Sequence, residues 1–328
     1  MSHGRSMIAV VLLIPTVIAS ALWAFLWPNA RLEPRDLPLG VAGPAQATAP
    51  VKTQLERHDG AFEVHTYADE DAARTAIEER DIYGAVVVTR QGPQLLTASA
   101  AGPAVAQLLT DAVGGQDGRP VPAKDVVPLP KEDARGTALG SSVLPMALAG
   151  IAIGGAVTAL GLRGTRAATA VLGAATTIGL VAAGIAHSWL GALAGNWWAE
   201  AGAFALVVLA GGATVAGLAA LLGTGGIGLG SLLVMLLGNP FSGVSTAPEL
   251  LPEPAATLGQ LLPPGAGGQL LRSVAYFDGN AVGGPLLTLG VWALLGLSLI
   301  RLGEPVKRRR TTGGPEPAGG VRPASSVA

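Results

Sequence analysis

The sequence predicts an α-helical polytopic membrane protein with six transmembrane helices and a small extracytoplasmic α/β domain between the first two. Half of the 328 residues are hydrophobic and only 13% are charged, whereas soluble chains are about one quarter charged. Apolar segments close to the ~20 residues that span a bilayer recur along the chain. They are 7–27, 143–162, 167–186, 202–222, 226–238 and 284–303. The first five contain no Asp, Glu, Lys or Arg, and only Arg301 lies in the sixth.

Residues 1–27 are expected to form a short cytoplasmic N-terminus and a permanent membrane anchor. The uncharged run from Met7 to Trp27 is longer than the roughly 7–15 apolar residues of a cleavable signal peptide. Trp23 and Trp27 near its end are typical of the aromatic belt at a membrane interface. The run therefore predicts a signal anchor that remains in the mature protein.

Residues 28–141 are expected to form the α/β domain, because they hold 16 of the 22 acidic and 11 of the 21 basic residues and alternate between short elements. Strands are expected at 37–41, 62–67, 81–89, 95–98 and 125–129. Helices are expected at 51–57, 69–80 and 101–113, with Asp69 or Glu70 capping the second. The β-branched run 86–88 predicts a buried strand that pairs with 95–98 across the turn at 91–93.

The basic residues orient the chain in the plasma (inner) membrane. With both termini cytoplasmic, nine basic residues lie inside, namely Arg5, Arg163, Arg166, Arg301, Lys307, Arg308, Arg309, Arg310 and Arg322. The outer segments 187–201 and 239–283 contain one, Arg272, and four acidic residues. This bias places 28–141 outside the cytoplasm. The short segment 226–238 counts as a crossing, because otherwise the basic cluster 307–310 would lie outside.

The chain carries no motif that predicts an enzyme, a cofactor, a metal site or nucleic-acid binding. It has no Cys, its four His are scattered, and it contains neither a complete Walker A motif nor a Gly-x-Ser-x-Gly elbow. Gly226-Ile-Gly228-Leu-Gly230 lacks the preceding strand and the following Lys-Ser/Thr of a phosphate-binding loop. Its glycines, like Gly150 and Gly154, are expected to allow close helix packing.

Three further segments carry structural expectations. In 142–303, the five-span membrane domain, the Pro-rich outer stretch 239–283 is expected to form short amphipathic helices in the membrane interface or re-entrant helices. Their apolar faces are Leu258, Leu261 and Leu262, then Leu270, Leu271, Val274 and Phe277. His187, close to Trp189, Trp197 and Trp198, is expected to anchor the chain at the interface. Residues 304–328 are expected to form a disordered basic cytoplasmic tail, whose cluster at 307–310 either serves as a stop-transfer anchor or attracts anionic membrane lipid.

One stretch of the membrane part and two of the α/β domain resemble a known family, the type-2 ABC transporter permeases, in the branch similar to phage-infection proteins. The membrane stretch contributes Asn239-Pro240-Phe241-Ser242-Gly243, Pro248, Leu262-Pro263 and Leu271-Arg272. The domain contributes Leu37-Pro38-Leu39-Gly40-Val41 and Tyr83-Gly84-Ala85-Val86-Val87-Val88. A single anchor, an extracytoplasmic α/β domain and five further spans also resemble the layout of that branch.

The resemblance implies the membrane subunit of an ATP-driven exporter, paired with itself or with a similar permease and served by a separate cytoplasmic ATPase. Arg163 and Arg166, between the second and third spans, would then contact the ATPase. Two features leave an alternative open: only residues 1–6 precede the first span, and the loop at 163–166 is very short. The alternative is a non-transporting envelope scaffold or receptor whose outer domain binds a protein or surface ligand.

Overall fold

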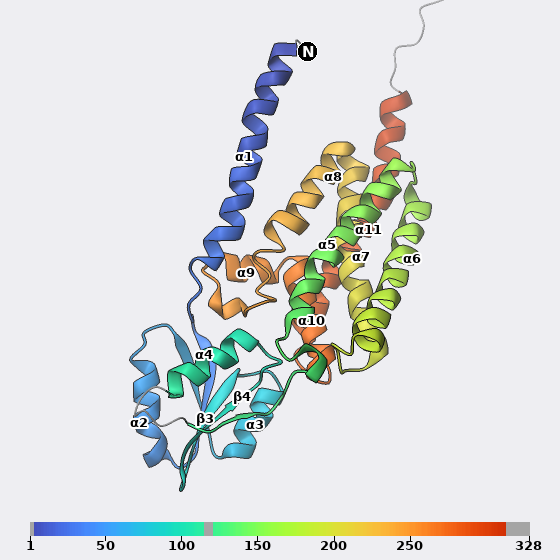
Figure 1. Cartoon of the computed structure of the whole chain (residues 1–328). Coiled ribbons are helices and arrows are strands. Elements are labelled where there is room, and N and C mark those ends of the chain that lie inside the picture. The colour runs from blue at the N-terminus through green and yellow to red at the C-terminus, as the bar shows by residue number, and fades with distance from the viewer. Residues whose placement is uncertain (1–2, 115–120, 313–328) are drawn as a thin grey trace, which may run out of the picture.

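The computed structural model describes residues 3–114 and 121–312 of the chain. Figure 1 shows a bundle of long helices with a small α/β domain at one end. We call this the sheet end of the bundle. The opposite end, where α1 begins and α11 finishes, is the terminal end.

Five helices are long and apolar enough to cross a membrane, and by this criterion the chain is a multi-pass membrane protein. They are α1 (His3–Asn29), α5 (Thr137–Ala159), α6 (Gly164–Ala183) with its π-helical continuation η2 (Gly184–Trp189), α7 (Trp197–Leu222) and α11 (Gly283–Thr312). Helix α11 continues past Gly303, so the part of the expected tail at 304–312 is helical. Residues 313–328 lie outside the described part of the chain.

The sixth expected span, 226–238, corresponds to a shorter apolar helix. It consists of α8 (Thr224–Ser231) and the π-helical η3 (Leu232–Leu237). At 1.5 Å per residue it measures about 21 Å, against about 30 Å for the hydrocarbon core of a bilayer. Figure 1 shows that α8 nevertheless leads from the terminal end back toward the sheet end. The structure thus supports five candidate spans and one shorter return helix.

Helix α7 lies at the centre of the bundle, where it packs against α5, α6 and α11. The expected close packing at Gly150 and Gly154 is confirmed: a Cβ at Gly150 would lie 3.0 Å from the backbone nitrogen of Gly212, and one at Gly154 would lie 2.6 Å from Cβ of Val215. Without side chains at these positions, the backbones of α5 and α7 approach closely, as in other membrane bundles.

The α/β domain contains a five-stranded sheet in the order β2-β1-β3-β4-β5. Strands β3 and β4 pair antiparallel, and the other neighbours are parallel. The strands are β1 (Leu37–Ala42), β2 (Phe62–Tyr67), β3 (Gly84–Thr89), β4 (Gly92–Thr97) and β5 (Ala123–Asp125). The helices are α2 (Ala45–Glu56), α3 (Glu70–Glu78) and α4 (Pro103–Gly114), followed before α5 by the 3-10 turn η1 (Lys131–Asp133).

Most elements of this domain lie where the sequence predicted them. Asp69 caps α3 by accepting a hydrogen bond from the backbone nitrogen of Ala72 at 2.9 Å. Three predictions were wrong in position. The turn between β3 and β4 was expected at 91–93, but β4 already begins at Gly92, which pairs with Thr89. Strand β5 lies at 123–125 rather than 125–129, because β4 pairs with 123–125. Helix α2 begins at Ala45, well before the predicted 51, because Pro50 is accommodated inside the helix.

The segment 239–283 enters the bundle instead of remaining at its surface. It forms η4 (Pro248–Leu250), α9 (Ala255–Gln260) and α10 (Pro263–Tyr276). Leu258 and Leu261 of α9 are exposed, whereas every residue of α10 from Pro263 to Ser273 is buried. Of the two expected alternatives, a helix that lies in the interface is therefore wrong for α10, which packs against α5, α7 and α11, whereas a re-entrant helix stays a prediction. The Gly-Ala-Gly-Gly run of α10, 265–268, permits this packing because it carries almost no side chains.

The same segment completes both hydrophobic cores of the α/β domain. Ala247 and Leu250 are buried together with Leu37 and other residues of β1, β3, β4 and α4. Phe277 is buried with residues of α3 and β3 on the other side of the sheet. The domain predicted at 28–141 consequently shares its interior with residues that follow it by more than 100 positions.

Candidate functional site

The residues singled out in the sequence fall into two groups that the fold keeps apart. Arg163 and Arg166 lie at the terminal end, at the connection between α5 and α6. The family-like residues lie in the segment that leads from η3 to α10. They are Asn239, Pro240, Ser242, Gly243, Pro248, Pro263 and Arg272.

The loop between η3 and η4 is compact and held by its own polar groups. Ser242 Oγ donates to the carbonyl of Asn239 at 2.7 Å, and Gln260 Nε2 donates to the carbonyl of Ser242 at 2.9 Å. Gly243 has φ of +63°, and a Cβ there would lie 2.8 Å from the backbone nitrogen of Pro248. This left-handed, crowded position explains the glycine. The loop is thereby fixed against η4 and α9.

Arg272 ties α10 to this loop. Its side chain is 3% exposed, and Nη2 donates to the carbonyl of Val244 at 2.7 Å. Within the described part of the chain, Nη1 is buried without a hydrogen-bond partner. The sequence had placed Arg272 among the charges of an outer loop, but the structure buries it in the joint between the bundle and the α/β domain.

Arg80 reaches the same joint from the α/β domain. It follows the end of α3 in a left-handed conformation, with φ of +69°. The backbone nitrogen of Arg80 donates to the carbonyl of Ile77, and the backbone nitrogen of Asp81 donates to the carbonyl of Ala76. These two hydrogen bonds form a Schellman motif, in which the position that Arg80 occupies is usually a glycine. An arginine therefore carries a conformational cost here of about 1 kcal/mol.

The guanidinium of Arg80 binds α10 at its Gln269–Ser273 face. Nη1 donates to the carbonyl of Gln269 at 3.2 Å and to Oγ of Ser273, while Nη2 donates to Oε1 of Gln269 at 2.6 Å. The group also lies 5.3 Å from the centre of the Phe277 ring, a cation–π distance. Sequence reasoning missed this contact, because 189 residues separate Arg80 from Gln269 and no local pattern marks either one.

A tyrosine and a carboxylate complete the polar joint. Tyr83 donates its hydroxyl to Oε2 of Glu249 at 2.7 Å. Burial, and then the negative charge of Glu249, raise the pKa of Tyr83. Burial, and then the positive charge of Arg272, lower the pKa of Arg80 to about 10, so Arg80 remains a cation at neutral pH. The joint thus combines two guanidinium groups, those of Arg80 and Arg272, with one carboxylate.

Beside this joint lies a cavity of about 410 Å³ between the α/β domain, α9, α10 and the start of α11. Arg80 and Gln269 contribute polar groups to its wall, and Ile82, Leu261 and Pro285 contribute apolar ones. This volume lies within the range of small-molecule sites.

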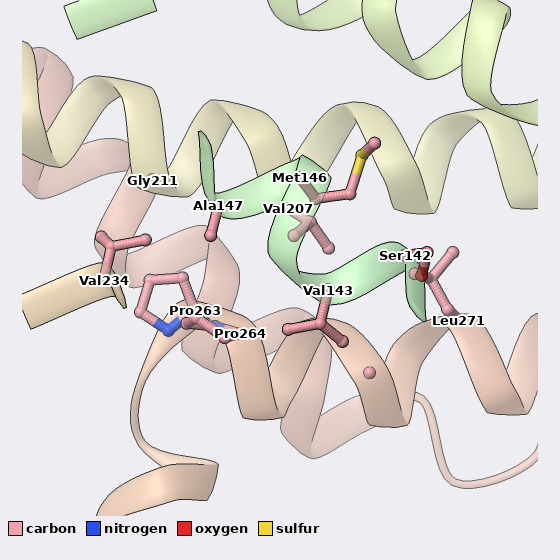
Figure 2. A pocket seen from close by; sticks show the side chains of 12 residues that line it. Ser142, Val143, Met146, Ala147, Val207, Gly211, Val234, Pro263, Pro264 and Leu271 are labelled. Carbon is pink, nitrogen blue, oxygen red and sulfur yellow. The ribbon is translucent and has the colours of Figure 1, made fainter. Parts of the chain in front are cut away.

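Two other cavities are smaller. One of about 80 Å³ lies at the terminal end between α5, α6, α7 and α11, and the exposed Arg163 contributes to its wall. Figure 2 shows the other, of about 10 Å³, where Pro263 and Pro264 of α10 face Val234, Val143 and Ala147. This volume holds at most about one water molecule. Helix α10 is therefore tightly enclosed in the bundle.

His187 makes a contact that the sequence did not predict. Its Nδ1 lies 2.9 Å from Oε2 of Glu200, whose side chain has 0% exposure at the start of α7. Glu200 Oε1 also accepts from the backbone nitrogen of Gly195 at 2.9 Å. The interpretation of His187 as an interfacial anchor is incomplete, because the ring pairs with a buried carboxylate that had been assigned to an outer loop.

Replacing Glu200 with leucine is expected to lower the free energy of unfolding by about 2 kcal/mol, because the Gly195 N–H loses its acceptor and the His187 ring loses its hydrogen-bond partner. Unfolding in detergent, followed by the fluorescence of the neighbouring Trp197 and Trp198, measures the change. Glu200→Gln keeps one amide oxygen and should lose less. Equal stabilities of wild type and the leucine variant would contradict a stabilising role of the pair.

The joint combines the guanidinium groups of Arg80 and Arg272 with the carboxylate of Glu249, which accepts from the Tyr83 hydroxyl. In residues 3–114 and 121–312, no three His, Asp or Glu side chains come together in a way that could hold a metal ion. No protein-family model, no curated protein and no solved structure matches the chain.

Proposed function

We propose that the chain is the membrane subunit of an ATP-driven exporter of the type-2 ABC class, with a separate ATPase subunit and a second permease copy or a similar permease as partners. The observation that carries the proposal is the α9–α10 hairpin, which follows the short return helix, enters the bundle and leaves it before α11. The family-like residues lie in this hairpin and in the loop before it. Any ATPase activity would belong to the partner.

In this proposal the chain crosses the plasma (inner) membrane six times, with α8 and η3 as the short crossing. Both termini lie in the cytoplasm, together with the exposed Arg163, Arg166 and Arg301 of the terminal end. The α/β domain lies outside. The positive-inside rule supports this orientation, and the burial of Arg272 removes the one basic residue that the sequence had counted against it.

A specific observation also favours the alternative of a receptor or scaffold. The 410 Å³ cavity lies at the sheet end and is partly walled by the α/β domain, where an external ligand would arrive. The polar joint would transmit such binding to α10 through Arg80. A receptor needs no ATPase, so the composition of the native complex separates the two functions.

Reversing both charges at the α5–α6 connection, with Arg163→Glu and Arg166→Glu, is expected to reduce copurification of a cytoplasmic ATPase at least tenfold. Both side chains are exposed, so the bundle itself should not depend on them. The measurement is affinity purification of the tagged chain from its native membrane in mild detergent, with quantitative mass spectrometry. An ATPase carrying a Walker A motif should accompany the wild type stoichiometrically.

The matched control is Arg163→Lys with Arg166→Lys, which preserves the charge that the positive-inside rule requires and should retain the ATPase. If the glutamate variant kept the ATPase at the wild-type ratio, these two residues would not form the contact. If the crosslinked wild-type chain were purified without any ATPase, the result would favour the receptor or scaffold function over the exporter function.

A further inference from the structure

A buried carboxylate at the sheet end of the bundle pairs with a histidine that reaches the surface. The side chain of Glu200, in the first turn of α7, is 0% exposed, whereas that of His187, in η2, is 30% exposed. Nδ1 of His187 lies 2.9 Å from Oε2 of Glu200. Among the described residues, His187 is the only ion-pair partner of this carboxylate. The pair thus links a group that water does not reach to a ring that can exchange a proton with the solution.

The pair fixes the loop between η2 and α7, residues 190–196, which packs on α10. Tyr276 of α10 donates its hydroxyl to the carbonyl of Ala192 at 3.0 Å. Gly195 lies so close to the carbonyl of Val274 that a Cβ on this glycine would overlap it. The backbone nitrogen of Gly195 in turn donates to the buried carboxylate at 2.9 Å. The carboxylate therefore holds the residue of the loop that meets the last turn of α10.

The other charged groups around this loop do not take the place of the histidine. Of the charged residues in 131–135, on and after η1, only Asp133 is buried, and it accepts from the first turn of α5. On α10, burial raises the pKa of Tyr276, so its hydroxyl stays protonated, and Arg272 donates to the loop before η4. Helix α5 has no charged residue, and those of α6 and α11 lie toward the terminal end.

We propose that the His187–Glu200 pair is a pH-sensitive latch, which holds the 190–196 loop against α10 at acidic pH and loosens it as the pH rises. An imidazole changes its charge between about pH 5 and 8. As a cation, His187 compensates the buried charge of Glu200, whereas the neutral ring leaves that charge without a counterion. With the α/β domain outside, as proposed above, the latch responds to the pH outside the cytoplasm. It does not depend on an ATPase.

The test compares the purified full chain with its His187→Asn variant in a nonionic detergent at two pH values. Asparagine offers an amide nitrogen in place of Nδ1 but carries no charge. The Tm of the wild type is expected to exceed that of the variant by about 3 °C at about pH 5.5, and by less than about 1 °C at about pH 8. Hydrogen–deuterium exchange in peptides covering 190–196 and 271–277 should be at least about threefold faster in the variant at the acidic pH and equal at the higher pH.

A second histidine provides the matched control. His65 lies 3.5 Å from Glu63, but both side chains are exposed, so His65→Asn should keep the Tm of the wild type at both pH values. Glu200→Gln removes the charge from the other side of the latch and should show the same pH-dependent loss as His187→Asn, which gives the test a second variant. The proposal is overturned if the loss in these two variants is equal at both pH values, if His65→Asn shows the same loss, or if exchange in 271–277 does not follow the change in Tm.

Discussion

Replacing Gly296 with leucine is expected to destabilise the bundle by about 3 kcal/mol through the interface between α7 and α11. A Cβ at Gly296 would lie 2.7 Å from the backbone nitrogen of Thr214, and one at Gly217 would lie 2.7 Å from the carbonyl oxygen of Gly296. The neighbours are backbone atoms of helices, which cannot turn aside as a side chain can. The two helices must therefore separate, with loss of their packing.

The free energy of unfolding, measured by titration with sodium dodecyl sulfate and circular dichroism, tests this expectation. Gly290→Leu is the matched control, because it adds the same side chain to the same helix at a position where a Cβ would meet no described atom within 4 Å. It should change the free energy of unfolding by less than about 0.5 kcal/mol. A similar loss in both variants would show that leucine perturbs α11 itself rather than its contact with α7.

Replacing Arg80 with methionine is expected to weaken the joint between the α/β domain and α10 by about 3 kcal/mol. The change removes three hydrogen bonds and leaves the buried hydroxyl of Ser273 and the amide oxygen of Gln269 without their donor. It also removes the cation from the ring of Phe277. Hydrogen–deuterium exchange should therefore rise in peptides covering 76–83 and 266–280, while exchange in the centre of α7 stays constant.

Two further substitutions separate the contributions of Arg80. Arg80→Lys keeps the charge but not the planar fork that serves Gln269 and Ser273 together, so it should recover only part of the loss. Arg80→Gly loses the side chain but relieves the left-handed backbone, so it should be about 1 kcal/mol more stable than Arg80→Ala. Unchanged exchange in the methionine variant would contradict the role of Arg80 as the link.

The sequence predicted the elements whose cause is local. The length of the apolar segments predicted the five long helices. The alternation of apolar and polar residues predicted β2 at 62–67, where the structure has it. Asp69 could be recognised as a cap because its partner lies three residues away. The paired glycines of α5 could be read as packing positions because their spacing alone aligns them on one helix face.

What the sequence could not predict depends on distant partners. Arg272 and Glu200 were counted as loop charges because charge normally indicates exposure, and only the fold shows the carbonyl of Val244 and the ring of His187 beside them. Helix α10 was expected to lie in the membrane interface or to be re-entrant, because its apolar residues are spaced as in an amphipathic helix. Its glycines allow neighbours to cover the remaining face as well. The cavity likewise combines walls from four separate regions.

The shared interior of the α/β domain has a consequence for the order of biosynthesis. Residues 28–141 leave the ribosome first, yet Ala247, Leu250 and Phe277, which close the two cores, are translated more than 100 residues later. At about 5–20 residues per second, the nascent domain waits several seconds with apolar surface uncovered. Its maturation is thus timed by the arrival of α10, and a chain that terminates before residue 277 would present an unfinished domain to chaperones and proteases.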